Sequence, residues 1–309
     1  MARSGVPCTK GSDPGPSGAA GGGTCLGYTR VVPAERIAAN LAFINWTVLT
    51  GLALGSFAAV VLARLRTDAT RGFVAFTGAC AVAIGILAFL SDQALPAAVA
   101  DTPIRIDPAF DIPRRFALGG FCVIAAAYVV AVARGRRAPI LAGLGLVLAG
   151  ATLGFGALGW AGSVPLAIPL LLQLVVLTVA TGGVFAAMIL GHWYLVTPKL
   201  PEAPLILISR ILLAVVGLQL ALFVVWSATG AGPGGGGPFS ILVGPWAMFV
   251  WLRLIVGLIF PLVVSWAAVQ TARTRSMESA TGLLYINVGT IAAGTILAAG
   301  LYFGAGLLV

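Results

Sequence analysis

One apolar stretch occurs twice in this sequence, as Val48-Leu-Thr-Gly-Leu-Ala-Leu-Gly-Ser-Phe-Ala-Ala-Val-Val-Leu62 and, with substitutions, as Val176-Leu-Thr-Val-Ala-Thr-Gly-Gly-Val-Phe-Ala-Ala-Met-Ile-Leu190. Thr, Gly and Phe recur at matching places, and in an apolar stretch they match by chance less readily than Leu or Ala. The pair therefore predicts a duplicated unit. Only the second copy continues into Gly191-His-Trp-Tyr-Leu195, which contains the only histidine of the chain.

The composition is typical of a membrane protein. Of 309 residues, 60% are hydrophobic and 9% are charged, which is more apolar surface than one soluble core can bury. The formal charge is +9, but in such a chain basic residues mark cytoplasmic loops more often than a nucleic-acid surface. We expect a lipid bilayer as partner, no nucleic acid, and a multi-pass location in the bacterial inner membrane.

Residues 1–34 are rich in Gly, Pro and Ser and lack the pattern of a signal peptide, so they predict a flexible tail. Cys8 and Cys25 lie in this tail and could form a disulfide only if it faces an oxidising compartment. Cys80 and Cys122 fall in apolar runs, where packing is the expected role. The sequence shows no paired Cys/His spacing of a metal site.

Eight apolar runs follow the tail, and each supplies the ~20 helical residues that cross a ~30 Å hydrocarbon layer. Because lipid offers no partner to an unpaired backbone group, runs of this length are expected to be helical. The predicted fold class is all-α integral membrane, with transmembrane helices near 37–65, 72–95, 114–133, 139–161, 166–195, 204–228, 248–271 and 280–307.

The loop charges predict the orientation of these helices. Basic residues follow every odd-numbered run and place those loops in the cytoplasm: Arg64, Arg66, Arg71, Arg134, Arg136, Arg137, Lys199, Arg273 and Arg275. The loop after the second run carries Asp92, Asp101, Asp107 and Asp111, and the loop after the sixth is rich in glycine. Both loops and both termini are expected outside.

The duplication extends past its first helix. Residues that match between the halves include Arg71 with Arg210, Arg115 with Arg253, Arg137 with Arg275, and Gly143 with Gly282. Residues 35–162 and 163–309 are therefore predicted to be two four-helix bundles in the same orientation, related by a pseudo-twofold axis along the membrane normal.

The repeat also predicts the depth of Arg253. Its partner Arg115 opens a helix, and Arg253 precedes the cytoplasmic Arg273 by about 30 Å of helix, so Arg253 is expected near the outer surface. Residues 239–252, which include Trp251, then form an interfacial or re-entrant segment. Arg253 either snorkels to the interface or stands beside an anionic or carbonyl-bearing ligand.

Asp92 ends the second apolar run on the same outer side and could lie near Arg115 and Arg253. A partly buried carboxylate there could accept the proton of a quinol hydroxyl during oxidation. The alternative is an ordinary carboxylate at a helix end. With Trp251, these residues form a candidate quinone site.

His192 and Tyr194 lie at the inner end of the fifth run, where the composition is that of an interfacial aromatic belt. A lone histidine cannot supply both ligands of a bis-histidine haem, whereas a haem or chlorin with one protein ligand stays open. Glu278, Lys199 and Arg210 are on the same side and could join His192 in a proton or ligand network. The alternative is solvated charge at the loop edges.

Three stretches suggest a family. Leu49-Thr-Gly-Leu-Ala-Leu-Gly-Ser-Phe-Ala-Ala-Val-Val-Leu-Ala-Arg64 resembles the Gly-rich first helix of NrfD/PsrC-type membrane subunits of polysulfide reductase-like complexes. Leu87-Ala-Phe-Leu-Ser-Asp-Gln-Ala-Leu-Pro96 resembles the end of their second helix, and Phe249-Val-Trp-Leu-Arg-Leu-Ile-Val-Gly-Leu-Ile-Phe-Pro-Leu262 resembles a later helix of theirs. The resemblance implies two haem-free four-helix bundles, quinone exchange at the outer face beside an iron–sulfur partner, and Asp92 as the acidic quinone-site residue.

The sequence contains no P-loop, no dinucleotide-binding glycine motif and no nucleophile–base pair in a soluble context, so the chain has no catalytic domain of its own. We expect a haem-free integral subunit of a respiratory-type electron-transfer complex, which would make it the quinone-reactive part of an oxidoreductase. The alternatives are a small-solute or ion transporter and a purely structural accessory subunit.

Overall fold

The chain folds into helices and connecting turns, without a β-strand in the residues that the structure, a computed structural model, describes (32–97, 104–197 and 201–309). These residues belong to one compact unit, Val32–Val309. Most of the predicted tail, with Cys8 and Cys25, lies outside the described residues, as does Lys199. The end of the predicted tail begins α1, Pro33–Ala39, a short helix that the sequence did not indicate.

Eight helices are long and apolar enough to cross a membrane, which confirms the predicted all-helical membrane fold. Their bounds agree with the predicted runs to within a few residues. The long helices are α2 Leu41–Arg66, α3 Arg71–Gln93, α4 Asp111–Ala133, α5 Pro139–Trp160, α6 Val164–Val196, α7 Ala203–Thr229, the joined α8 Ala247–Leu254, η3 Ile255–Ile259 and α9 Phe260–Arg273, and α10 Met277–Ala305. Single turns are η1 Pro108–Phe110 and η2 Ser240–Leu242.

Local chemistry sets several helix ends. Thr70 caps α3 by accepting a hydrogen bond from the backbone N–H of Phe73. Pro139 opens α5, where its missing N–H is not needed. Gly230 and Gly306 end α7 and α10 in the left-handed conformation, which glycine adopts without steric cost.

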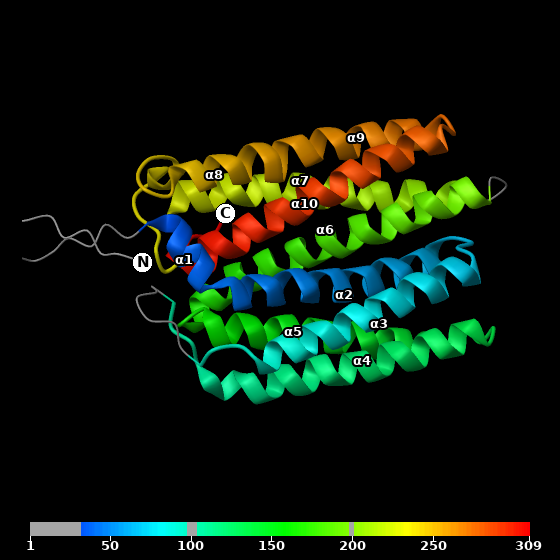
Figure 1. Cartoon of the computed structure of the whole chain (residues 1–309), viewed down its shortest axis with the longest axis horizontal. Helices are drawn as coiled ribbons and strands as arrows, with labels where there is room; N and C mark the ends of the chain where they lie inside the picture. Colours follow the sequence, from blue (N-terminus) through cyan, green and yellow to red (C-terminus); the bar gives the residue numbers. More distant parts are fainter. Residues whose placement is uncertain (1–31, 98–103, 198–200) are drawn as a thin grey trace, which may run out of the picture. The chain divides into compact units, whose positions relative to one another are not determined.

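Successive helices pack as neighbours in two groups (Figure 1). The first group holds α2 to α5, and the second holds α6, α7, the α8–α9 helix and α10. The groups meet mainly through α2 and α6, and α10 also packs on α2.

The α2–α6 contact is made by backbone. A β-carbon on Gly55 would overlap the carbonyl oxygen of Thr178, and one on Gly182 would overlap Gly55 and the backbone nitrogen of Ser56. Ser56 Oγ also donates to the carbonyl of Gly182 at 3.3 Å. Small residues therefore let two central helices touch along the repeated stretch, as is common between membrane helices.

The predicted interfacial segment 239–252 divides at Trp246. Residues before Ala247 form turns, in which Phe239 N donates to Ser227 O at 2.7 Å. Residues from Ala247 onward are the first turns of the seventh long helix. The seventh helix therefore starts within the segment, and Arg253 lies near the end of α8.

Candidate functional site

Asp92 is the centre of a buried ion cluster. Its Oδ2 accepts hydrogen bonds from Trp46 Nε1 and Arg114 Nε, each at 2.7 Å. Its Oδ1 accepts from Arg115 Nε at 3.0 Å and Arg114 Nη2 at 3.2 Å. A carboxylate offers about four lone-pair positions, and these four hydrogen bonds occupy them.

Three helix ends bring these groups together. Asp92 lies one residue before the end of α3, Arg114 and Arg115 lie in the first turns of α4, and Trp46 lies near the start of α2. Consecutive antiparallel helices put these ends on the same side. The contact that was predicted between Asp92 and Arg115 is present, whereas Arg114 was not singled out.

Arg114 is the more deeply placed arginine. Its side chain is 1% exposed, against 36% for Arg115. On α4 it shares a face with the buried Ala117, Leu118 and Phe121, at spacings of three, four and seven residues. This periodicity identifies Arg114 from the sequence as the buried arginine, because only Arg114 of the two adjacent arginines continues the apolar face.

Aromatic rings cover the buried side of the cluster. The Arg114 guanidinium carbon lies 4.8 Å from the ring centroid of Trp160 and 5.9 Å from that of Trp46, within the range of cation–π attraction. Trp46 and Trp160 meet edge to face at 4.7 Å, and Phe303 of α10 packs on Trp160 at 5.4 Å. The cluster therefore joins the first helix group to the last helix of the second.

The cluster carries balanced charge. Asp111 adds a second carboxylate, 2.9 Å from Arg114 Nη1, so two arginines face two aspartates. Removing both charges of a pair from water is costly, and the repeated hydrogen bonds offset that cost. Arg115 is the only one of the three donor side chains to Asp92 that is substantially exposed, so a polar ligand arriving at this helix end would meet it first.

Arg253 belongs to a different set of contacts. Its side chain donates to Gln219 Oε1 at 2.7 Å and to the carbonyl of Gly257 at 3.1 Å, and the residue is 2% exposed. The structure therefore does not place Arg253 among the hydrogen-bond donors to Asp92, which are Arg114, Arg115 and Trp46. The side chain does not snorkel, because it is enclosed between helices.

The contact with Gly257 has a local cause. In an α-helix the carbonyl of residue 257 would accept from the N–H of residue 261, but residue 261 is Pro, which has none. The helix widens to the π-turn η3 at this place, and Arg253 Nη1 supplies a donor. Arg253 Nε has no hydrogen-bond partner among the described residues, so a buried donor is left over.

Trp251 lies apart from both arginine sets. The residue is 45% exposed, and its Nε1 donates to the carbonyl of Leu242 at 3.2 Å, in the turn before α8. This hydrogen bond joins the turn that contains Leu242 to α8. The structure does not bring Trp251 to Asp92 as a shared quinone site.

The predicted inner network is not assembled as such. His192 is exposed, and its Nδ1 lies 3.4 Å from the hydroxyl of Tyr285 of α10, whereas the buried Tyr194 donates to the carbonyl of Pro201. Glu278 is exposed at the start of α10 and has no ion pair with a described residue. His192 thus joins a tyrosine that the sequence did not suggest.

One ion pair does lie at this end. Glu202 accepts from Arg275 Nε, and this hydrogen bond, with the attraction of the two charges, raises the pKa of Arg275 above its usual value. Both partners are on turns beside helix ends, where water screens them, so the pair contributes little to stability.

Comparison of the chain with protein-family models, curated proteins and solved structures yields no match. Among the described residues no three His, Cys, Asp or Glu side chains gather in a way that could hold a metal ion. The candidate site is therefore defined by its geometry: a buried carboxylate, one buried and one accessible arginine, and an aromatic wall.

Proposed function

We propose that this protein is a haem-free integral membrane subunit of a respiratory-type electron-transfer complex and that quinone or quinol binds beside Arg115. The observation that carries the proposal is the exposure difference within the Asp92 cluster: Asp92 is 0% and the Arg115 side chain 36% exposed. A quinone carbonyl can accept a hydrogen bond from Arg115. A quinol hydroxyl can replace Arg115 at Oδ1 of Asp92 and pass its proton there.

The proposed ligand would meet both polar and apolar groups. Arg115 provides the donor, while lipid-exposed apolar side chains of the same helix, such as Phe116 and Ile112, leave an apolar approach from the bilayer. Electron transfer itself requires a redox partner, so we also propose an iron–sulfur protein bound at this end, in a bacterial inner membrane.

Quinone titration in nanodiscs, followed by quenching of tryptophan fluorescence, tests the proposal because Trp46 and Trp160 border the cluster. We expect Arg115→Gln to weaken binding ~10-fold, the scale of one lost charge-assisted hydrogen bond. Arg105→Gln, which removes an exposed arginine outside the cluster, should leave binding unchanged. Equal affinity of wild type and Arg115→Gln would refute the assignment.

We further propose that the two helix groups are parallel repeats with both termini outside. Three facts support it: neighbouring helices pack in the same order in both groups, the repeated stretches touch at Gly55 and Gly182, and Arg115 and Arg253 both lie early in corresponding helices. In a cysteine-free background, Arg136→Cys should react with an impermeant maleimide only after the membrane is opened. Asp107→Cys should react in intact cells, and the reverse pattern would invert the topology.

A second candidate function is the movement of an anion, favoured by Arg253. This buried cation has no carboxylate partner among the described residues, and its Nε makes no hydrogen bond to them. An unpaired buried guanidinium of this kind is suited to bind an anion. Proteoliposomes loaded with chloride or phosphate provide the test. Flux that disappears in Arg253→Met would favour transport, and no flux above that of empty liposomes would remove this candidate.

A further inference from the structure

A cavity lies at the other end of the first helix group, far from Asp92. It has a volume of about 640 Å³ and is formed by the end of α2, the end of α4 and the start of α5. Four of its lining residues are arginines, Arg64, Arg66, Arg136 and Arg137, and Asp68 is the only acidic one. The cavity is therefore strongly cationic, and its volume is that of a small-ligand site.

The arginines are not neutralised by the protein. None of the four forms an ion pair with a carboxylate in the described chain. Arg64 makes one hydrogen bond, from Nη1 to the carbonyl of Ala69 at 3.2 Å, which holds its guanidinium in place without cancelling its charge. Arg64 is half-buried and the other three arginines are exposed to water, and an anion in the cavity would be attracted by all four.

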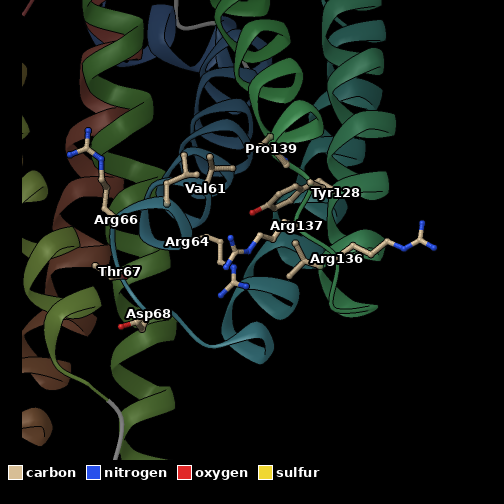
Figure 2. A pocket seen from close by; sticks show the side chains of 13 residues that line it. Val61, Arg64, Arg66, Thr67, Asp68, Tyr128, Arg136, Arg137 and Pro139 are labelled. Carbon is tan, nitrogen blue, oxygen red and sulfur yellow. The ribbon is translucent and has the colours of Figure 1, made fainter.

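The side chains divide into two pairs by direction. Figure 2 shows the guanidinium groups of Arg64 and Arg137 pointing toward one another across the cavity, with the hydroxyl of Tyr128 beside them. Arg66 and Arg136 extend away from that centre. Tyr128 is 3% exposed, and its hydroxyl has no hydrogen-bond partner among the described residues. In this view two guanidinium groups and one hydroxyl group thus lie near one another at the cavity.

We infer that this cavity binds a phosphate group carried by an anionic phospholipid. A phosphate diester has two anionic oxygens, which two guanidinium groups and a hydroxyl can satisfy together. The start of α5, at Ala138 and Pro139, borders the cavity and adds the positive end of a helix of 22 residues. Val61, Leu65 and Val132 also line the cavity and offer apolar contact to the first carbons of an acyl chain, beside the polar Thr67 and Asp68.

A lipid is favoured over a free phosphate by the position of the cavity. It lies at the ends of membrane-length helices, the level at which headgroups lie, and its apolar lining would contribute nothing to inorganic phosphate. The site is independent of the proposed quinone chemistry, because it shares no residue with the Asp92 cluster.

Native mass spectrometry of the full chain, delipidated and then supplied with phosphatidylglycerol, tests the inference. We expect at least one phosphatidylglycerol to be retained in preference to phosphatidylcholine. Arg64→Gln and Arg137→Gln should each weaken retention ~10-fold, since each removes a charge-assisted hydrogen bond. Arg66→Gln and Arg136→Gln are the matched controls, with the same loss of charge on outward-pointing side chains, and should change retention less than twofold.

Three results would overturn the inference. One is equal loss in all four variants, which indicates diffuse attraction to the basic end. Another is equal retention of phosphatidylglycerol and phosphatidylcholine. The third is binding of inorganic phosphate at the same concentration as phosphatidylglycerol, which would assign the cavity to a free anion. Tyr128→Phe keeps the packed ring and removes only the hydroxyl group, so it separates a loss of lipid binding from a loss of folding. It should weaken retention a few-fold with an unchanged circular dichroism spectrum.

Discussion

Arg115 Nε lies 3.0 Å from Asp92 Oδ1 in an ion pair whose carboxylate is completely buried and whose arginine is 36% exposed. Arg114 binds the same carboxylate from inside, at 1% exposure. Two arginines that are adjacent in sequence therefore contribute differently to the free energy of unfolding. Arg114 is shielded from water and depends on Asp92, Asp111 and the tryptophan rings for its contacts, whereas water can replace the contacts of Arg115.

The first prediction follows from this difference. Arg114→Gln should lower the free energy of unfolding by about 3–5 kcal/mol, because it leaves a buried carboxylate short of donors. Arg115→Gln should cost about 1 kcal/mol or less, as for a partly exposed pair. Thermal unfolding in a mild detergent measures both. Similar midpoints for the two variants would show that burial does not control the cluster.

The second prediction concerns the coupling of Asp92 with Arg114. Asp92→Asn keeps the shape of the side chain but leaves Arg114 buried beside a neutral amide, so it should be destabilising by about 3 kcal/mol or more. Combining it with Arg114→Met should be less destabilising than the sum of the single changes, since the double variant buries no unpaired charge. Asp68→Asn, at an exposed aspartate that forms no ion pair with a described residue, is the control. Strict additivity would contradict a direct pair.

The third prediction uses adjacent glycines of α6. Gly182→Ala should prevent the close contact with Gly55 and strongly lower the yield of folded protein, because the added methyl meets backbone that cannot move aside. Gly183→Ala adds the same methyl where no other atom lies within 4 Å of it, and should be neutral or stabilising. Size-exclusion profiles and unfolding midpoints compare the two. A well-folded Gly182→Ala protein would disprove the contact.

The fourth prediction links Arg253 to Pro261. Pro261→Ala restores an N–H that the Gly257 carbonyl can accept, so the donor from Arg253 becomes less important. Arg253→Met should therefore cost less stability in the Pro261→Ala background than in the wild type, by about 1 kcal/mol. A thermodynamic cycle of the four proteins measures the coupling. An equal cost in both backgrounds would mean that Gly257 gains nothing from Arg253.

The helices could be predicted closely because each rests on a local property, an apolar run of membrane length. The pairing of Asp92 with Arg115 was also accessible, since both lie at ends of consecutive helices. Arg114 was missed although helical spacing from Phe121 marks it as the buried arginine. The match between the two halves marks Arg115, whereas the buried face of α4 marks Arg114.

The contacts of Arg253 and His192 depend on information that single helices do not carry. Gln219 and Tyr285 come from other helices, and no spacing rule identifies them. Pro261, by contrast, was visible in the sequence and indicated a carbonyl without its usual donor. A proline four residues beyond a buried carbonyl and an arginine four residues before it form a pattern that can be sought in other membrane helices.

The backbone contact of Gly55 with Gly182 restricts where anything can cross this protein. At that level α2 and α6 leave no space for a side chain, and so none for a hydrated ion or a quinone ring. A conduit that passes directly between Gly55 and Gly182 would need those helices to separate. The interiors of the two four-helix groups are therefore the first places to search for a permeation route through the closed arrangement.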